Sequence, residues 1–486
     1  DYKKKEVLLK RGTASGILPP ILSIGPNKPQ GNDKLILNTY KFIDSLIDGE
    51  KKYKALNDFL EKKHPNIKDV KEGKKIIQND EFDKEIPKII SNLNDSYIYI
   101  QGPPGTGKTY QAANAITELL KQNKKIAITG LSHKVIHNLL YRVEEMASKK
   151  QIEFVGYKRG NLEDDDQIFN GEYIQTHSKD PVFMDALEES NVGQIFAGTK
   201  FHLSSRYYDE KIDFLFIDEA GQVSLADLIS IGNIAKNIVL IGDQNQLGQP
   251  IKGTHPNNSG QSILDYLLEG KDTIPDDRGI FLNKTYRLHS KINNFISSNF
   301  YEERLICDER TDKRVIHFNK NSIIKDSGIH FIEMKHENNI QTSLEEFEVV
   351  NKLMKQMIGS DYEDNGKKRK LNVEDFLIIS PYNTQVNLLI SKLEEAKIKN
   401  PKVGTIDKFQ GQEAPITIIS MTSSDSDSLP RNKEFFFSRN RLNVAISRAQ
   451  VASIILFNPS LLDSSPKNLD HIKLMNNFFK FLNYKI

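Results

Sequence analysis

The chain of 486 residues has one cysteine, nearly balanced charges and no long apolar run. The single Cys307 excludes an internal disulfide and any metal site built from several cysteines, and it predicts a reducing, cytoplasmic location. The longest apolar run, near Ile454–Phe457, has the length of a strand, so no membrane span is predicted. Lysine and arginine total 67 against 65 acidic residues, so any basic track for nucleic acid must be local.

From about Ser96 onward, short β-branched runs alternate with amphipathic helical stretches, and this alternation occurs twice. The pattern is typical of βαβ units on parallel sheets, so we predict an α/β fold with two domains in tandem. Residues 359–369 are rich in charge and are predicted to form a solvated loop. The predicted segments are an N-terminal leader (1–75), a first domain (76–279) with an inserted subdomain (150–192), and a second domain (280–486).

A phosphate-binding loop is predicted where the sequence matches G-x-x-x-x-G-K-[ST] in full, between a strand pattern and a helix pattern. A chance glycine-rich turn is the alternative, and the flanking strand and helix disfavour it. Lys108 would reach the β- and γ-phosphates of a nucleotide, and the Thr109 hydroxyl would ligate Mg²⁺. Tyr110 stands where a dinucleotide-binding loop needs its third glycine, which disfavours that fold. The residues expected to hold the nucleotide are Gly102, Gly105, Thr106, Gly107, Lys108 and Thr109.

Two further strand patterns end in polar residues suited to the same site. The run 214–217 is followed by Asp218 and Glu219. In P-loop enzymes such carboxylates hold Mg²⁺ and position the attacking water, although an exposed acidic turn would look the same in isolation. The run 237–241 leads to Gln246, whose amide is predicted to sense the γ-phosphate.

Arginines near the C-terminus predict a contribution from the second domain. Arg441 and Arg448 are seven residues apart, so they would share one face of a predicted helix. An arginine that reaches the transferred phosphoryl group from a second domain stabilises the transition state. A surface helix with two solvated arginines is the alternative.

Six motifs occur in a fixed order over residues 96–457, and together they resemble superfamily 1B helicases, the branch that contains the nonsense-mediated-decay RNA helicase. They are GPPGTGKT, IDEAGQ, GDQNQL, TYR, VGTIDKFQGQE and RLNVAISRA. The stretches THPNNSGQSILDYLL, DRGIFLNKTYRLH and TGLSHKVIHNLL resemble the helicase half of bacterial and archaeal proteins with a RecB-like nuclease domain upstream. The first residue is not Met, which fits a C-terminal piece of such a protein.

The resemblance implies two RecA-like domains with ATP between them. Arg287 and Arg448 would reach the γ-phosphate, Tyr286 would stack on the adenine, and Glu413 would contact the ribose or the γ-phosphate side. Relatives usually place a glutamine shortly before the P-loop to read the adenine. Gln78 lies too early for this role, so selectivity for ATP over other nucleotides stays open.

A track for single-stranded nucleic acid is predicted where strands end away from the P-loop. Each of its residues also suits an ordinary turn or helix cap, and the resemblance decides in favour of phosphate contact. His133 stands where relatives commonly have a small polar residue. The predicted contacts are Ser132, His133, Thr199, Pro381, Tyr382, Gln385, Thr405 and Gln410.

We therefore expect a monomeric ATP-driven translocase or helicase that moves 5′→3′ on single strands, with DNA favoured over RNA by the nuclease resemblance. A nucleic-acid-stimulated ATPase that clamps without unwinding shares every motif. An inactive scaffold is disfavoured by the intact Lys108, Glu219 and Arg448, and a kinase or switch is disfavoured by the second domain.

Overall fold

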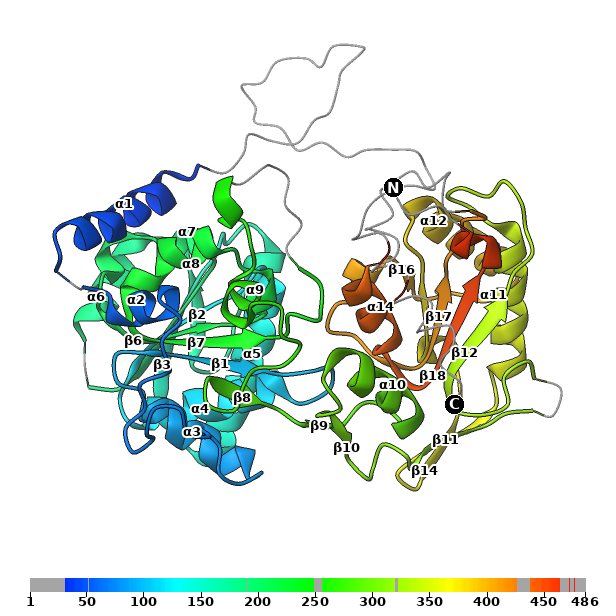
Figure 1. Ribbon diagram of the computed structural model, residues 1–486, viewed down its shortest axis with the longest axis horizontal. Helices are drawn as coiled ribbons and strands as arrows, with labels where there is room; N and C mark the ends of the chain where they lie inside the picture. Colours follow the sequence, from blue (N-terminus) through cyan, green and yellow to red (C-terminus); the bar gives the residue numbers. More distant parts are fainter. Residues whose placement is uncertain are drawn as a thin grey trace, which may run out of the picture. The chain divides into compact units, whose positions relative to one another are not determined.

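The computed structural model describes residues 31–50, 52–189, 191–248, 256–319, 322–425, 438–463, 472 and 476. Residues 34–486 form one compact unit, and residues 1–33 form another, of which only 31–33 are described. The large unit contains two parallel sheets (Figure 1). Both sheets are flanked by helices, which confirms the predicted α/β class.

The first sheet has eight parallel strands in the order β4-β3-β5-β2-β6-β7-β1-β8. Its strands are β1 (Tyr97–Gln101), β2 (Lys125–Thr129), β3 (Phe154–Arg159), β4 (Ile174–His177), β5 (Gly193–Ala197), β6 (Ile212–Ile217), β7 (Ala235–Gly242) and β8 (Gly279–Phe281). β1 is buried along its whole length, because helices cover both faces of the sheet.

Alternate residues of β1 enter two different cores, as the two-residue period of a strand requires. Ile98 and Ile100 pack with α3, α4 and α5, whereas Tyr97 and Tyr99 pack with α2, α6, α8 and α9 on the other face. The helices of this region are α1 (Asp33–Ile47), α2 (Lys54–Leu60), α3 (Phe82–Ser91), α4 (Lys108–Lys121), α5 (His133–Lys150), α6 (Asp180–Glu188), α7 (Lys200–Leu203), α8 (Leu225–Ile231) and α9 (Ile263–Leu268).

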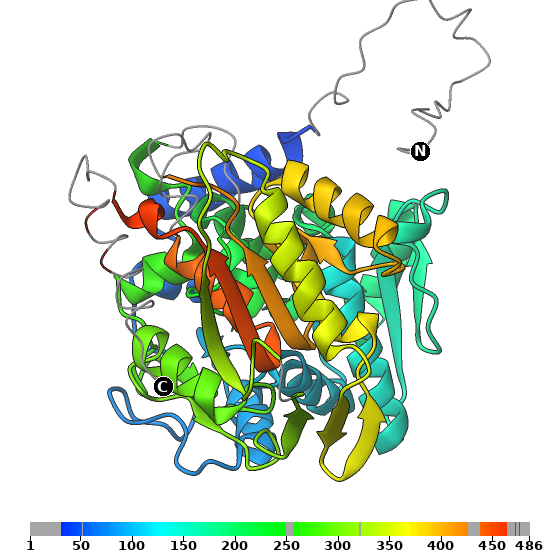
Figure 2. The same ribbon diagram turned by 90° about the vertical axis from the view of Figure 1, so that its right-hand side faces the viewer.

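The second sheet has five parallel strands in the order β12-β18-β17-β15-β16. Helices α11 and α12 cover the face that Figure 2 turns toward the viewer, and α10 and α14 pack with the opposite face. The elements are α10 (Ser290–Phe300), β12 (Gly328–Glu333), α11 (Leu344–Met357), β15 (Phe376–Ile379), α12 (Asn383–Glu395), β16 (Val403–Gly404), β17 (Ala414–Ser420), α14 (Arg439–Ile446) and β18 (Ala449–Phe457). One apolar cluster runs from the first sheet through α10 and α14 to the second, so the two sheets share a core.

The predicted solvated loop at 359–369 is wrong. It forms a hairpin of β13 (Asp361–Asp364) and β14 (Lys367–Lys370), which joins β11 (Arg314–His317) in an antiparallel sheet. Asn365 and Gly366 both have positive φ, as the tight turn of a two-residue hairpin needs. Tyr362 is buried while the lysines face water, so one face of the hairpin has an apolar anchor. Two short strands, β9 (Lys284–Thr285) and β10 (Ile306–Cys307), pair separately.

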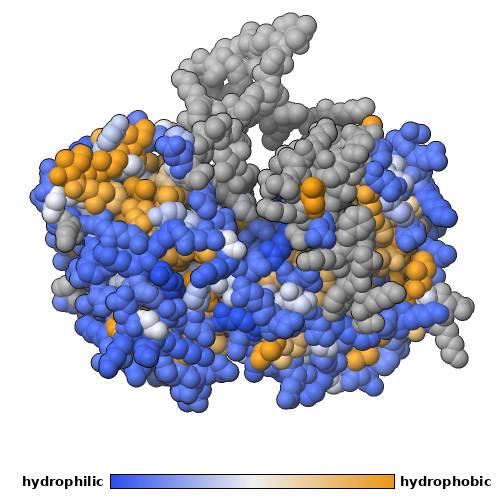
Figure 3. Space-filling view, viewed as in Figure 1, coloured by the Kyte–Doolittle hydropathy of each residue, from blue (hydrophilic) through white to orange (hydrophobic). Residues whose placement is uncertain are grey.

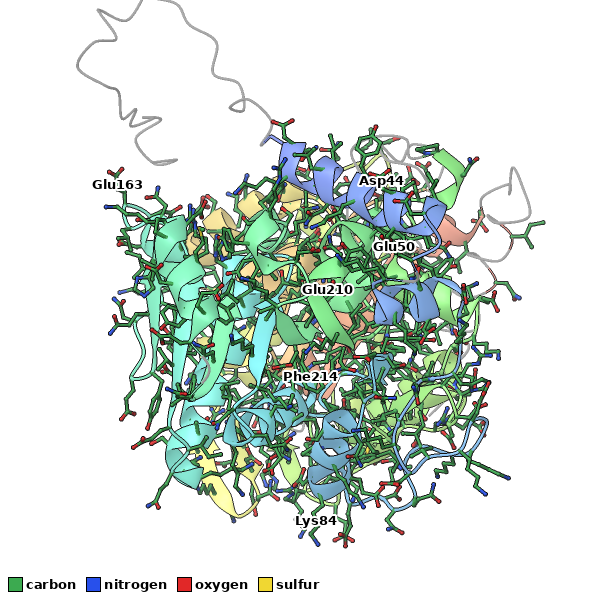
Figure 4. All side chains as sticks on the ribbon, turned by 90° about the vertical axis from the view of Figure 1, so that its left-hand side faces the viewer. Asp44, Glu50, Lys84, Glu163, Glu210 and Phe214 are labelled. Atoms are coloured by element: carbon green, nitrogen blue, oxygen red, sulfur yellow. The ribbon has the colours of Figure 1, made fainter. Side chains whose placement is uncertain are left out.

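The described part of the predicted leader from residue 34 onward and the predicted insertion both pack on the first sheet. Residues 150–192 supply the two strands at one edge of the sheet, β3 and β4, and Glu163 lies at the outer corner beyond them (Figure 4). α1 buries Leu35 and Phe42 but leaves a cluster of apolar side chains exposed, which appears as the apolar patch over α1 in Figure 3. The predicted boundary between 279 and 280 falls inside β8, so the chain leaves the first sheet after Phe281. Within the described residues, no helix has the length and hydropathy to cross a membrane.

Candidate functional site

The sheet order explains why the predicted phosphate-site residues meet. β6, β7 and β1 are neighbours and run parallel, so their carboxyl ends lie at one edge. The P-loop follows β1, Asp218 and Glu219 follow β6, and Gln246 follows β7. Ligands bind at such edges of open parallel sheets, because the loops after the strands converge there.

The P-loop curls over the start of α4 with its glycines in the conformations that only glycine adopts easily. Gly105 and Gly107 have φ values of 74° and 81°, and Gly107 caps α4. A Cβ atom on Gly102 would lie 2.0 Å from the Lys108 side chain. The Lys108 ammonium donates to the Gly102 carbonyl over 2.6 Å, so the loop holds the lysine side chain at the N-terminus of α4. Backbone N–H groups at this helix start form the kind of site that binds a phosphate.

A cavity of about 590 Å³ lies over the P-loop and is lined from both sheets. Gly105, Thr106 and Gly107 belong to its lining, as do Lys108 and Thr109. The other predicted catalytic and metal residues on its wall are Asp218, Glu219, Gln246, Arg287 and Arg448. Figure 3 shows strongly hydrophilic residues along the boundary between the two halves on this face.

Asp218 and Glu219 are adjacent in the chain but differ in burial and in backbone conformation. Asp218 is buried, and its burial together with the nearby Glu219 raises the pKa of its carboxyl to about 7. Lys108 acts in the opposite direction. Glu219 is half-buried and has a φ of 53°, which is unusual for a residue with a side chain. Such backbone strain is concentrated at functional sites, and here it turns the Glu219 carboxylate to the cavity wall.

The residues present fit a magnesium ion held jointly with a nucleotide. Mg²⁺ is usually bound by one or two carboxylates plus the phosphate oxygens of the substrate. The Asp218 carboxylate and the Thr109 hydroxyl line the cavity together and supply that donor set. In the described part of the chain, no three His, Cys, Asp or Glu residues cluster as a protein-only metal site.

Gln246 belongs to a buried polar network that joins the two halves of the unit. Its amide donates to Asp243 Oδ2 over 2.8 Å, and the Tyr301 hydroxyl donates to the same oxygen over 2.6 Å. Asn443 of α14 donates to the Tyr301 hydroxyl over 3.0 Å and to the Asn245 carbonyl over 2.8 Å. The loop that holds Gln246 is therefore tied to the helix that precedes Arg448.

The start of α14 is anchored to the same region of the first half. Arg439 forms two hydrogen bonds to the Asp272 carboxylate, of 2.7 and 2.8 Å. Asn440 donates to the backbone carbonyls of Gln244 and Gln246, each over 2.8 Å. α14 thus contacts the loop after β7 along its length.

Arg448 lies beyond the end of α14, so the prediction that it shares a helix face with Arg441 is wrong. The helix ends at Ile446, and Arg448 directly precedes β18. Its side chain is 4% exposed, and its Nε has no hydrogen-bond partner among the described residues. Burial and the nearby Arg287 lower the pKa of Arg448, but a guanidinium keeps its charge at neutral pH. A buried cation that faces a cavity is suited to an anion.

Arg287 is held by Glu413. The Arg287 Nε donates to Glu413 Oε2, and Gln450 donates to Oε1 over 2.8 Å. The Arg287 guanidinium lowers the pKa of Glu413, although desolvation acts against it. Glu413 itself is absent from the lining of the large cavity, so its predicted contact with ribose or phosphate stays a prediction.

Tyr286 lies in a smaller neighbouring pocket. Its backbone N–H donates to the Gly105 carbonyl over 2.9 Å, and the Thr285 hydroxyl donates to the Pro104 carbonyl over 2.8 Å. These two bonds hold the start of the second half against the P-loop. Tyr286 is 45% exposed, and the Arg310 guanidinium lies over its ring, 5.2 Å from the centroid, so the predicted stacking on adenine stays a prediction.

The predicted nucleic-acid residues have different surroundings, and their contact with a strand stays a prediction. Ser132 and Gln410 line the cavity over the P-loop, and Ser132 also caps α5 by accepting from the Val135 N–H over 3.4 Å. His133 is half-buried, and desolvation lowers the pKa of its imidazole. Thr199 and Thr405 begin α7 and a 3₁₀ turn (Ile406–Phe409) without a side-chain capping bond, so their hydroxyls are not used as caps.

Two predicted strand contacts are buried. Gln385 is fully buried, exchanges hydrogen bonds with the backbone of Ser343, and donates to the Ser420 hydroxyl. Tyr382 is 5% exposed and belongs to the core. Gln385 is held by Ser343, the N-cap residue of α11, whereas Tyr382 packs in the core that includes α10 and α14. Pro381, beside them, is half-buried and keeps part of its ring at the surface.

The sequence also held a signal that the interpretation missed. Lys134, Asn138 and Arg142 all line the large cavity. They recur every four residues along α5, so they form one polar stripe on a helix that starts at Ser132. Lys408 also lines the cavity, from the turn before β17. The spacing of the α5 residues could have revealed their common face.

The geometry indicates a P-loop nucleotide site between two parallel α/β halves, and the family models agree with a nucleotide-binding class. Residues 86–257 match one family model described as an AAA domain, and residues 260–460 match a second with the same description. The chain is 27% identical over 399 residues to the "DNA replication ATP-dependent helicase/nuclease dna2" of Schizosaccharomyces pombe, covering 76% of this chain and 27% of that protein. It is 26% identical to the "DNA polymerase alpha-associated DNA helicase A" of the same organism, covering 72% and 59%.

A solved structure of arterivirus nonstructural protein 10, a helicase with DNA, aligns with a TM-score of 0.38 and 14% identity over 75% of this chain and 61% of that one. The chain spans about a quarter to three fifths of the two curated relatives above. The family models and the curated relatives confirm the predicted resemblance to superfamily 1 helicases. The likeness to proteins with an upstream RecB-like nuclease stays a prediction.

Proposed function

We propose that this chain is an ATP-driven motor that travels 5′→3′ on single-stranded nucleic acid, preferring DNA, as the helicase part of a longer protein. The observation that carries the proposal is the cavity over the P-loop, which receives Lys108 from one half and the buried Arg448 from the other. A site divided in this way can hydrolyse ATP only when both halves approach, so chemistry and domain movement are linked.

Each residue has a defined part in the proposed reaction. Lys108 and the P-loop amides bind the β- and γ-phosphates, and Thr109 with Asp218 would hold Mg²⁺, which offsets charge on the phosphate oxygens when bound. Glu219 orients the attacking water and accepts its proton. Arg448 stabilises the charge that spreads over the γ-phosphate oxygens in the transition state.

Arg287 and Gln246 are proposed to report the state of the γ-phosphate. Arg287 is paired with Glu413, and the γ-phosphate would compete with that carboxylate for the guanidinium. Gln246 is held on Asp243 and connects through Tyr301 to α14. Loss of the γ-phosphate would therefore change side-chain contacts in both halves.

The strand is proposed to contact residues of both halves where they meet. Ser132, His133 and Thr199 would contribute from the first half, and Pro381, Thr405 and Gln410 from the second. The names of the two curated relatives above include DNA, which supports DNA over RNA as the track. An upstream nuclease domain, a monomeric state and a cytoplasmic location are further proposals, drawn from the resemblance and the single cysteine.

The test is ATP hydrolysis with no nucleic acid, with single-stranded DNA and with single-stranded RNA of matched length, each at low and high salt. We expect DNA to stimulate hydrolysis more than RNA, and salt to weaken the stimulation because the contacts are to phosphates. Lys108→Ala is the control and should abolish hydrolysis.

Two outcomes would contradict the proposal. Hydrolysis that neither single-stranded DNA nor RNA stimulates would contradict the proposed motor. Turnover retained by Lys108→Ala would contradict the assignment of Lys108 to the phosphates. A forked duplex with a 5′ or a 3′ single-stranded tail then tests direction and strand separation. Displacement from the 3′ tail alone would contradict 5′→3′ travel, and stimulated hydrolysis without displacement would indicate a clamp.

A further inference from the structure

The hairpin of β13 and β14 contributes no residue to the cavity over the P-loop, but it pairs with β11, which begins at Arg314. The Arg314 side chain is 15% exposed. Its Nη1 donates to the backbone carbonyl of Arg287 over 2.8 Å. Arg287, which lines the cavity, is therefore held by a second arginine that belongs to the small antiparallel sheet.

The hairpin fixes Arg314 in turn. Arg314 and Asp364 stand opposite each other in the antiparallel pair of β11 and β13, and Arg314 Nε donates to Asp364 Oδ1 over 3.3 Å. Opposite charges that face each other across two strands stabilise the pairing. The adjoining turn is also tied to β11, because the Asn365 N–H donates to the Lys313 carbonyl over 3.3 Å. Arg314 thus joins the hairpin to Arg287 through two different nitrogens, which the single nitrogen of a lysine cannot do.

Arg287 is held both at its backbone and at its side chain. Its N–H donates to the Thr285 hydroxyl over 3.3 Å, and its carbonyl accepts from Arg314. Its guanidinium is 13% exposed, donates to Glu413 and reaches the Ser447 carbonyl over 3.3 Å. A γ-phosphate that draws the guanidinium away from Glu413 exchanges side-chain contacts and leaves the backbone contacts intact. The bond from Arg314 would therefore hold the Arg287 backbone while the guanidinium moves.

Arg314 also acts on the carboxylate that Arg287 would leave. Desolvation acts to raise the pKa of Glu413, but the two arginines, Arg287 with the larger effect and Arg314 with a smaller one, lower it. A nearby opposite charge favours the ionised carboxylate. Glu413 would therefore keep a cation close by, and its hydrogen bond from Gln450, when the γ-phosphate takes Arg287.

We propose, resting on the ATPase function proposed above, that Arg314 is a positioning residue for Arg287. It holds the Arg287 backbone while the guanidinium exchanges Glu413 for the γ-phosphate, and Asp364 of the hairpin anchors it. The hairpin is thus a support of the nucleotide site. A change at Arg314 should weaken nucleotides that carry a γ-phosphate and spare those that lack it, because Arg287 is assigned to that phosphate.

The experiment measures equilibrium binding of ADP and of a non-hydrolysable ATP analogue, together with steady-state ATP hydrolysis. Arg314→Gln should weaken the analogue by about tenfold, because a hydrogen bond from a charged donor is lost, and should change ADP binding by less than about twofold. The turnover number should fall by at least about threefold. Arg314→Lys keeps the charge and can reach one of the two acceptors, so its losses should lie between those of Arg314→Gln and the wild type.

A double variant tests whether Arg314 acts through Arg287. Arg287→Ala alone should weaken the analogue, and adding Arg314→Gln should cause less than about a further twofold loss, because the positioned group is gone. Arg369→Gln is the matched control. Arg369 lies on β14 of the same hairpin and forms two hydrogen bonds to the Asp375 carboxylate, of 2.7 and 2.6 Å. Its loss should disturb the hairpin and keep the wild-type ratio of analogue to ADP affinity.

Thermal unfolding of each variant shows whether it is folded. The inference is overturned if folded Arg314→Gln weakens both nucleotides equally or neither, if Arg287→Ala binds the analogue as the wild type does, or if the losses in the double variant are additive. If Arg314→Gln does not fold, Asp364→Ala replaces it, and an unchanged affinity ratio in that variant has the same consequence. These outcomes leave the proposed ATPase intact. Wild-type protein that binds neither nucleotide and hydrolyses no ATP would contradict the proposed function instead.

Discussion

The two sheets present opposite ends to the cavity. In the first sheet the P-loop, Asp218 and Gln246 all follow strands, so carboxyl ends face the phosphates. In the second sheet Arg448 directly precedes β18 and Gln410 lies shortly before β17, so amino ends face them. The first half supplies the phosphate cradle and the carboxylates, and the second supplies cations. The proposed hydrolysis therefore draws on Lys108 and the carboxylates of one half and on Arg448 of the other.

The carboxyl ends of the second sheet serve a different purpose. Glu346 of α11 is fully buried there and accepts from the Thr422 backbone N–H and the Ser420 hydroxyl. Burial raises the pKa of this carboxyl, while His336 and the hydroxyl donors oppose the shift. Polar residues that follow a buried strand thus form a site in one sheet and a structural network in the other. The difference lies in whether a helix covers the strand ends.

The largest effect should come from Arg448→Ala. If the second half contributes its cation to the transition state, hydrolysis should slow by roughly 10³–10⁵-fold. Steady-state hydrolysis with saturating single-stranded DNA measures this loss. Arg441→Ala is the matched control, because Arg441 lies on α14 and pairs with Asp407 over 3.4 Å. If Arg448→Ala slows hydrolysis less than tenfold, Arg448 of the second half does not take part in catalysis.

Glu219→Gln should slow hydrolysis by roughly 10²–10⁴-fold, the usual contribution of a general base. The amide keeps the shape of the side chain, so ATP should still bind. Measuring nucleotide affinity beside turnover separates the two effects. Lost ATP binding would show that Glu219 supports the cavity and does not act on water.

Tyr301→Phe should lower the turnover number by about tenfold without changing the KM for ATP, because Asp243 loses one hydrogen-bond donor and the Gln246 loop loosens. In an Arg448→Ala background the same change should have no further effect, if Tyr301 acts through α14. Tyr97→Phe removes a hydroxyl that donates to the Lys63 carbonyl, so it controls for simple loss of packing. Additive losses in the double variant would mean that the two halves are not coupled here.

Gln385→Ala should have the smallest effect on function. It leaves the Ser343 backbone without its partners and should lower the free energy of unfolding by about 1–3 kcal/mol. Chemical denaturation measures that loss. The affinity of the folded variant for single-stranded DNA should change by less than about twofold, since Gln385 is buried. A loss of single-stranded DNA binding at unchanged stability would show that Gln385 contacts the strand after all.

The nucleotide-binding residues could be predicted from the sequence because they lie in contiguous motifs. The glycines, Lys108 and Thr109 occupy one loop between a strand and a helix, and their chemistry is local. Asp218 and Glu219 were recognisable because an apolar run ends at them. The strand-end residues of the second half lacked this support. Tyr382 and Gln385 look like exposed residues at the start of a helix, and only the tertiary structure shows that both are buried.

The sequence by itself determined the two parallel α/β halves, the P-loop and the carboxylates, because hydrophobic period and short spacing are local properties of the chain. The tertiary structure decided which of these groups share a cavity. It placed Arg448 beyond its helix and joined Gln246 to α14 through Asp243 and Tyr301. These relations join residues far apart in the chain, and no local pattern encodes the packing that brings them together.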